Sequence, residues 1–309
     1  MAEIINIDKN NLKIVDDFLN WLAIGHSLET VDSYKWPLRL FCKWLSGKEK
    51  NIADMKEKDF VGYHLFLKEE RQVKNSTMAH YFTSIRTLWR YMYRNEMVKY
   101  GDDKIPMPKA DDKQSYPYAE EADINKILNS FRGWDIKDIR DKAIVSLLYK
   151  TGLRIGELRS LDISDIDLEF KKATVQTEKR TGHKREIYWD DKTNEYLKNW
   201  IDTREEFLLQ ERRSENALFI GMTMGSKDKR IDRSTVQKMF RKKRDELGIN
   251  KKLTPHSCRH GFGHRAVEKN VNIRHLQVML GHSKIDTTMI YMGCKNKDVE
   301  TAYRQLMFA

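Results

Sequence analysis

Three histidines and an arginine fall within nine residues, in the stretch HSCRHGFGH at 256–264. A proline comes directly before this stretch, so we expect a helix to begin there. His256, Arg259 and His260 are then spaced i, i+3 and i+4, which puts them on one helical face. A guanidinium can bind two oxygens of a phosphate and an imidazole can transfer a proton, so the stretch predicts a phosphate site. It lacks the glutamate of a zinc-binding HExxH motif. His264, one turn further, fits a surface or core position equally well.

A second arginine lies in TGLRIGELRSL, residues 151–161. Gly152 is the expected end of a helix, and Arg154 follows it at once. Glu157 comes three residues later, so its carboxylate can orient the guanidinium across one helical turn. Taken alone, this pair would also fit an ordinary surface ion pair beside a helix start.

The third cluster is LGHSKIDTTMIYM, residues 280–292, in which His282 follows Gly281 and Tyr291 comes nine residues later. A lone tyrosine at such a place usually packs. Together, however, the three clusters supply two arginines to neutralise a pentacoordinate phosphate and histidines to move protons. A phenol, whose pKa is ordinarily about 10, needs a base and a cationic site to attack at neutral pH. The set therefore predicts metal-free phosphoryl transfer with Tyr291 as nucleophile and a lysine as acid for the leaving 5′ oxygen.

The elements that must position these residues are mostly helical. Ser27 and Ser76 occupy places where helix N-caps are expected. Apolar residues recur at helical spacing in three stripes between residues 10 and 100, which predicts the core of a helix bundle over residues 1–105. The stripes are Leu12, Val15, Phe18, Leu19 and Leu22; Val31, Tyr34, Leu38, Phe41 and Leu45; and Met78, Phe82, Ile85, Leu88, Trp89 and Met92.

A proline-containing, charged segment follows and predicts a linker over residues 106–118. Residues 119–309 predict a second, catalytic domain of α+β class, mostly helical with a small β-hairpin in KATVQTEKRTGHKREIYW. Two helices come before the hairpin, and the helices expected after it cover about 191–210, 233–247, 256–270, 272–280, 284–291 and, as a tail helix, 296–306.

The composition of the chain indicates an intracellular protein with an acidic binding partner. The formal net charge is +11 at pH 7, and nucleic acid is the commonest partner of such a basic chain. The three cysteines, Cys42, Cys258 and Cys294, are widely spaced and form no CxxC, which disfavours disulfides and zinc fingers. No signal peptide and no apolar run of about 18–20 residues is present, so we expect a cytoplasmic protein that associates with the nucleoid and not with a membrane.

At these motifs the sequence resembles the tyrosine recombinase (phage integrase) family. TGLRIGEL, HSCRH, LGHS and TTMIY match it in order between residues 151 and 291. The N-terminal stretch SLETVDSYKWPLRLFCKWL is similar to the family's core-binding domain, so the resemblance covers nearly the whole chain. Because we see no arm-binding domain before residue 10, a Xer-like enzyme is favoured, although a mobile-element integrase also fits.

The resemblance implies a role for each matching residue. Arg154 and Arg259 would grip the scissile phosphate. His256 would assist the tyrosine as general base, and His282 would be a second histidine that contacts the phosphate. Tyr291 would form the 3′-phosphotyrosyl link.

It also implies supporting residues and a general acid. Glu157 matches the acidic partner of the first arginine, and His260 matches the supporting residue after the second. The family carries a lysine in the hairpin turn, where Lys179 is our first choice and Lys184 the alternative. Arg180 lies nearer the usual position, but a guanidinium holds its proton too tightly to be a good general acid.

The resemblance further implies how the protein works with DNA. Two domains would clamp duplex DNA, one dimer on each site and a tetramer in the synapse, without metal, ATP or any cofactor, and with room for an accessory protein. The basic segment 227–246 would lie on phosphates, or else form a solvated amphipathic helix. The tail would dock on a neighbouring protomer, or pack in cis. Rival functions are type IB topoisomerase activity, a catalytically silent DNA-binding regulator and, more distantly, a zinc hydrolase.

Overall fold

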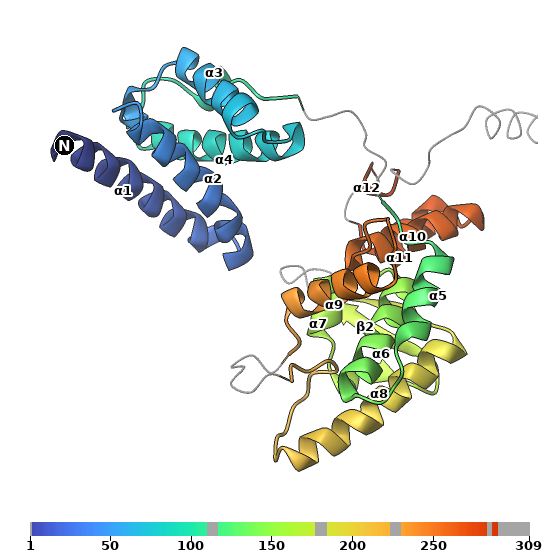
Figure 1. The fold of residues 1–309 in the computed structure, drawn as a ribbon. Coiled ribbons are helices and arrows are strands. Elements are labelled where there is room, and N and C mark those ends of the chain that lie inside the picture. Colours follow the sequence, from blue (N-terminus) through green and yellow to red (C-terminus); the bar gives the residue numbers. More distant parts are fainter. Residues whose placement is uncertain (1, 110–116, 177–183, 223–229, 283–285, 290–309) are drawn as a thin grey trace, which may run out of the picture. The chain divides into compact units, whose positions relative to one another are not determined.

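The computed structural model describes residues 2–109, 117–176, 184–222, 230–282 and 286–289. The chain divides into two compact units, residues 1–114 and 115–309, which are described separately (Figure 1). This division falls within the linker predicted at 106–118. No described helix is long and apolar enough to cross a membrane.

The described residues of the first unit form four α-helices: α1 Ala2–Gly25, α2 Leu28–Ser46, α3 Glu57–Leu65 and α4 Asn75–Arg94. A π-helical turn, η2 Phe66–Glu70, continues α3, and short 3-10 turns lie at η1 Ile52–Asp54 and η3 Asp102–Lys104. Ser27 caps α2 as predicted, because its hydroxyl accepts a hydrogen bond from the Thr30 amide at 3.3 Å. The prediction for Ser76 is wrong, since the N-cap of α4 is Lys74, two residues earlier.

The predicted stripes form the core of this unit. All six residues of the third stripe are fully buried, and the other two stripes contribute Val15, Phe18, Leu38 and Phe41, each fully buried. Burial of each such side chain contributes about 1.5–3 kcal/mol, so this core is the main source of the unit's stability.

The second unit carries the remaining elements. Its helices are α5 Glu121–Ser130, α6 Ile136–Thr151, α7 Ile155–Ser160, α8 Asp191–Gln210, α9 Arg233–Glu246, α10 Pro255–Glu268, α11 Ile273–Leu280 and α12 Asp286–Met289, with a 3-10 turn η4 at Ile163–Asp165. The apolar centre of α6 is buried on all sides because α8 and α10 both pack against it. The predicted mostly helical fold with a small sheet is confirmed.

One small antiparallel sheet completes the unit, with strand order β1-β2-β3. The predicted hairpin is present as β2 Lys172–Gln176 and β3 Lys184–Tyr188, paired so that Gln176 faces Lys184. A two-residue strand, β1 Ile166–Asp167, pairs with the outer side of β2 and had no separate signal in the sequence.

The helix α10 is fixed by a side-chain cap at its start and by close contact with the main chain at Ala119. Thr254 caps it and Pro255 is its first residue, so the helix begins one residue before the predicted start at 256. The amide of Ala119 donates to the carbonyl of Ser257 at 2.9 Å. A Cβ at Gly261 would overlap with the carbonyl oxygen of Ala119, so only glycine lets the two segments lie this close.

Candidate active site

Arg154 stands between two helices and is oriented by Glu157. Gly152 ends α6 in the left-handed conformation at φ 65°, and Arg154 is the N-cap of α7. The Glu157 carboxylate accepts from the Arg154 amide at 2.8 Å and from its Nη1 at 3.0 Å. The predicted contact across one helical turn is therefore confirmed. The carboxylate is buried, at 6% exposed, while the Arg154 side chain is 39% exposed and open to a ligand.

Arg259 reaches the same place from α10. Its side chain is 2% exposed. Nη1 donates to the carbonyl of Gly152 at 2.7 Å, and Nη2 donates to the carbonyl of Leu280 at 2.5 Å. The guanidinium thus ties α10 to the ends of two other helices.

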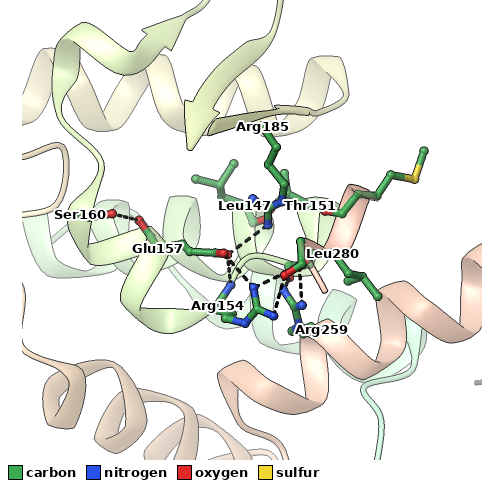
Figure 2. A network of polar contacts seen from close by, with 11 residues as sticks. Leu147, Thr151, Arg154, Glu157, Ser160, Arg185, Arg259 and Leu280 are labelled. Atoms are coloured by element: carbon green, nitrogen blue, oxygen red, sulfur yellow. Dashed lines mark hydrogen bonds and ion pairs between the residues drawn. The ribbon is translucent and has the colours of Figure 1, made fainter. Parts of the chain in front are cut away.

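The C-terminal end of α11 is where the arginines converge. Arg154 donates to the carbonyls of Leu280 and Gly281 at 3.2 and 3.0 Å, next to the bond from Arg259. A third guanidinium, from Arg185, donates through Nε to the carbonyl of Met279 at 3.0 Å. Figure 2 shows these side chains meeting beside Leu280. The last carbonyls of a helix lack helical partners and carry partial negative charge, which holds cations there.

Arg185 is a site residue that our sequence analysis did not find. It lies on β3, where burial alternates, and it shares the inward face with Ile187. Its Nη2 donates to the second oxygen of Glu157 at 3.1 Å, so Glu157 lies between two arginines. The signal was available: a charged residue at an inward position of a predicted strand needs a partner.

The histidines of α10 form a row. The rings of His256 and His260 meet edge to face, with 4.5 Å between their centroids, so the predicted common face is confirmed for these two histidines. Burial, and then the charge of Arg259, lowers the pKa of His256. Burial, and then His256, lowers the pKa of His260 to about 4. His264 continues the row away from the arginines, and its ring lies against that of Tyr118 at a tilt of 31°, with 4.1 Å between the ring centroids.

His282 is held directly after α11. Gly281 turns the chain in the left-handed conformation at φ 62°, and the His282 amide donates to the carbonyl of Gln277 at 3.0 Å. Its Nδ1 shares a hydrogen bond with the Thr288 hydroxyl at 2.8 Å. Burial, and then the charges of Arg259 and Arg154, lowers the pKa of His282 to about 4. The imidazole is therefore neutral at pH 7.

Two predicted site residues, Lys179 and Tyr291, lie outside the described residues, as does the tail helix at 296–306. Lys184 is described: it is the first residue of β3 and is exposed. The described part of the site joins Arg154, Glu157, Arg259 and His282 with Arg185, and it offers cationic donors beside neutral imidazoles. That combination suits an anionic phosphate ester and the movement of a proton.

Comparisons with known proteins point the same way. A family model described as "Phage integrase family" matches residues 118–297, and one described as "Phage integrase, N-terminal SAM-like domain" matches residues 15–96. The chain is 28% identical over 295 residues to a protein named tyrosine recombinase XerD from Oceanobacillus iheyensis, covering 94% of this chain and 96% of the relative. It is 24% identical to a tyrosine recombinase XerC from Leptospira interrogans, covering 93% and 91%.

Solved structures share the fold. XerH site-specific recombinase bound to palindromic difH substrate superposes with a TM-score of 0.70 at 20% identity, covering 90% of this chain and 80% of that one. The Tn1549 transposon integrase in complex with a circular intermediate DNA also gives 0.70, at 16% identity, covering 95% and 99%.

Proposed function

This chain belongs to the phage integrase family, and we propose that it cuts and rejoins duplex DNA as a Xer-type site-specific recombinase through a 3′-phosphotyrosyl intermediate. Matches to both family models, and to XerD and XerC proteins along nearly the whole chain, favour this function over a type IB topoisomerase or a silent regulator. Resolution of replicated DNA and mobile-element integration are both within its chemistry.

The observation that carries the proposal is the convergence of Arg154 and Arg259 on the carbonyl oxygen of Leu280. The two guanidiniums come from different segments, and a buried carboxylate orients the more exposed one. A pair of preoriented cations stabilises the charge that develops on a pentacoordinate phosphate, which is the main requirement of metal-free phosphoryl transfer.

In the proposed reaction the Tyr291 hydroxyl attacks the phosphorus of one strand. His256 takes the hydroxyl proton, for which its lowered pKa keeps it unprotonated at neutral pH. The bond between phosphorus and the 5′ oxygen breaks, and that oxygen takes a proton from Lys179 or, in the alternative, from Lys184. The 5′ hydroxyl of a partner strand then reverses these steps, so no external energy source is needed.

DNA binding would use the basic surface of the second unit. Helix α9 is amphipathic: Val236, Met239 and Phe240 are buried. Its exposed residues include Arg233, Lys238, Arg241 and Lys242. We place this face on the DNA backbone, with a dimer on each site and a tetramer in the synapse, and the protein in the cytoplasm with the nucleoid. The solved structures named above, of XerH bound to difH substrate and of the Tn1549 transposon integrase in complex with DNA, support DNA as the partner.

The test needs no known target. Wild type and Tyr291→Phe are incubated with pooled nicked duplexes from the source genome in EDTA, and SDS-stable protein–DNA adducts are collected. Wild type should form adducts and Tyr291→Phe should bind DNA equally well without forming any. An adduct that survives Tyr291→Phe refutes the nucleophile. Tight binding by wild type without any adduct would favour the silent regulator.

A further inference from the structure

Arg185 carries its charge into the interior of the second unit. The residue is 8% exposed, and its Nη1 atom is buried without a hydrogen-bond partner among the described residues. Removing a guanidinium from water is costly, and leaving one donor unmatched adds to that cost. A chain that needed only packing at this strand position would do better with an aliphatic side chain. The position therefore retains a charge for some reason other than packing.

The reason lies in the carboxylate between the two arginines. Glu157 accepts from Arg154 through Oε1 and from Arg185 through Oε2, and it is almost fully buried (Figure 2). With Arg154 alone, the ion pair would be formally neutral, so the carboxylate that orients the guanidinium would also cancel the charge a phosphate needs. With Arg185 present, the three side chains keep one formal positive charge. Arg154 is the exposed member of the three, so that charge faces a ligand.

We propose that Arg185 is a positioning residue that neutralises Glu157, so that Glu157 orients Arg154 without cancelling its charge toward the scissile phosphate. The proposal rests on the proposed function. Arg185 does not touch the DNA; it acts through Glu157 and, through its bond to the Met279 carbonyl, on the helix end that also holds Arg154 and Arg259.

A double-mutant cycle separates this electrostatic role from a merely structural one. The assay is the single-turnover rate of covalent adduct formation on a nicked duplex recovered from the wild-type adduct. Arg185→Met should slow it roughly ten- to a hundredfold, by analogy with the loss seen when the hydrogen-bond partner behind a metal ligand is removed. Glu157→Gln in that background removes the uncompensated carboxylate, so the double variant should recover several-fold over Arg185→Met. If the double variant is slowed by the product of the two single-variant factors, the two side chains act independently, and the proposal is overturned.

Two further variants control for folding. Arg185→Lys keeps the charge and should retain most of the rate; a loss equal to that of Arg185→Met would overturn the role of charge. Arg204→Met removes another buried arginine of the same unit, one that donates to the main-chain carbonyls of Ala217 and Glu215. At temperatures where melting shows it folded, it should form adducts at the wild-type rate. If Arg204→Met slows adduct formation as much as Arg185→Met does, loss of any buried arginine has this effect, and the proposed role of Arg185 is overturned.

The wild-type reaction tests the proposed function, whereas the ratios between variants on the same DNA test the role of Arg185. Failure of one is therefore distinguishable from failure of the other.

Discussion

At the scale of single residues, the candidate site combines neutral imidazoles with charged guanidiniums. His260 and His282 are both buried close to arginines, and both have pKa values lowered to about 4. A neutral imidazole can accept a proton or share a hydrogen bond with a hydroxyl, as His282 does with Thr288. The arginines, by contrast, stay charged whatever their surroundings. Of these two kinds of side chain, it is the histidines that gain charge as the pH falls from 7 toward about 4.

Stability should therefore fall on the acid side. The folded-state pKa of His282 lies below the unfolded value of about 6.5, so the unfolded chain binds the proton more readily. The contribution of the neutral His282 to the free energy of unfolding is fully present above pH 6.5 and is lost as the pH falls toward about 4. Urea unfolding at a series of pH values from 7 to 4 should show this loss, and His282→Gln should reduce its slope. If the free energy of unfolding of His282→Gln depends on pH as steeply as that of the wild type, the lowered pKa of His282 is contradicted.

The choice of general acid is a second question at this scale. Lys179→Ala should slow cleavage of an ordinary strand but not of one with a 5′-bridging sulfur, because a thiolate leaves without a proton. Adduct formation on matched oxygen and sulfur duplexes measures this. Rescue of Lys184→Ala instead would move the role to Lys184.

Contacts between site residues could be predicted from the sequence where both side chains lie on one helix at i, i+3 or i+4 spacing. The contact between Arg154 and Glu157 and the row of His256 and His260 both follow from i, i+3 and i+4 spacing, and both are confirmed. Arg185 was missed because its partner Glu157 lies 28 residues away, on another element. Spacing within one element reports nothing about such a pair. The catalytic roles themselves stay predictions.

At the scale of elements, the site depends on close approach between main-chain segments. Gly152, with φ 65°, ends α6 so that its carbonyl reaches Arg259, and a Cβ there would press on Phe262. Gly261 lets α10 lie against Ala119. Helix and hairpin types were predictable from periodicity, whereas these approaches were not, because they depend on which elements pack together. The same reason explains why β1 was not predicted.

Gly261→Ala should lower stability by about 1–3 kcal/mol, the range for overpacking in a tightly packed interior. The clash is with backbone, which cannot rotate away as a side chain can. Gly156→Ala is the matched control, since a Cβ at Gly156 in α7 meets nothing within 4 Å. It should be neutral or slightly stabilising. Chemical denaturation of both variants provides the measurement, and equal stabilities would contradict the close approach.

At the scale of the whole molecule, charge and the family match agree. The net charge of +11 predicted a nucleic-acid partner, and the chain belongs to a family of DNA recombinases. The ordered motifs predicted that membership although no single motif would have done so. Both units match family models, so the bundle and the mostly helical second unit are one functional pair in the proposal.

DNA binding should weaken steeply with salt. Each phosphate contact that releases a counterion contributes about 0.9 to the slope of log K against log salt concentration. The triple change of Lys238, Arg241 and Lys242 to Ala on α9 should therefore reduce the slope by about 2 to 3. Affinity for pooled genomic duplexes between low and moderate salt measures it. Lys192→Ala with Lys198→Ala, which removes exposed charges from α8, should change the slope less; an equal change per residue would contradict the placement of α9 on DNA.

The end of α11 has a consequence for how this protein can evolve. Its contacts to Arg185, Arg154 and Arg259 come from main-chain oxygens, which every amino acid supplies. Met279 is 43% exposed, so its side chain is free to drift while its carbonyl stays in use. Substitutions at that position should be nearly silent. A one-residue insertion or deletion in α11 would instead rotate the helix by about 100° and withdraw the oxygens together. Selection at Met279 therefore acts on length and register and leaves little trace in residue identity, whereas the buried Leu280 and the left-handed Gly281 beside it stay restricted.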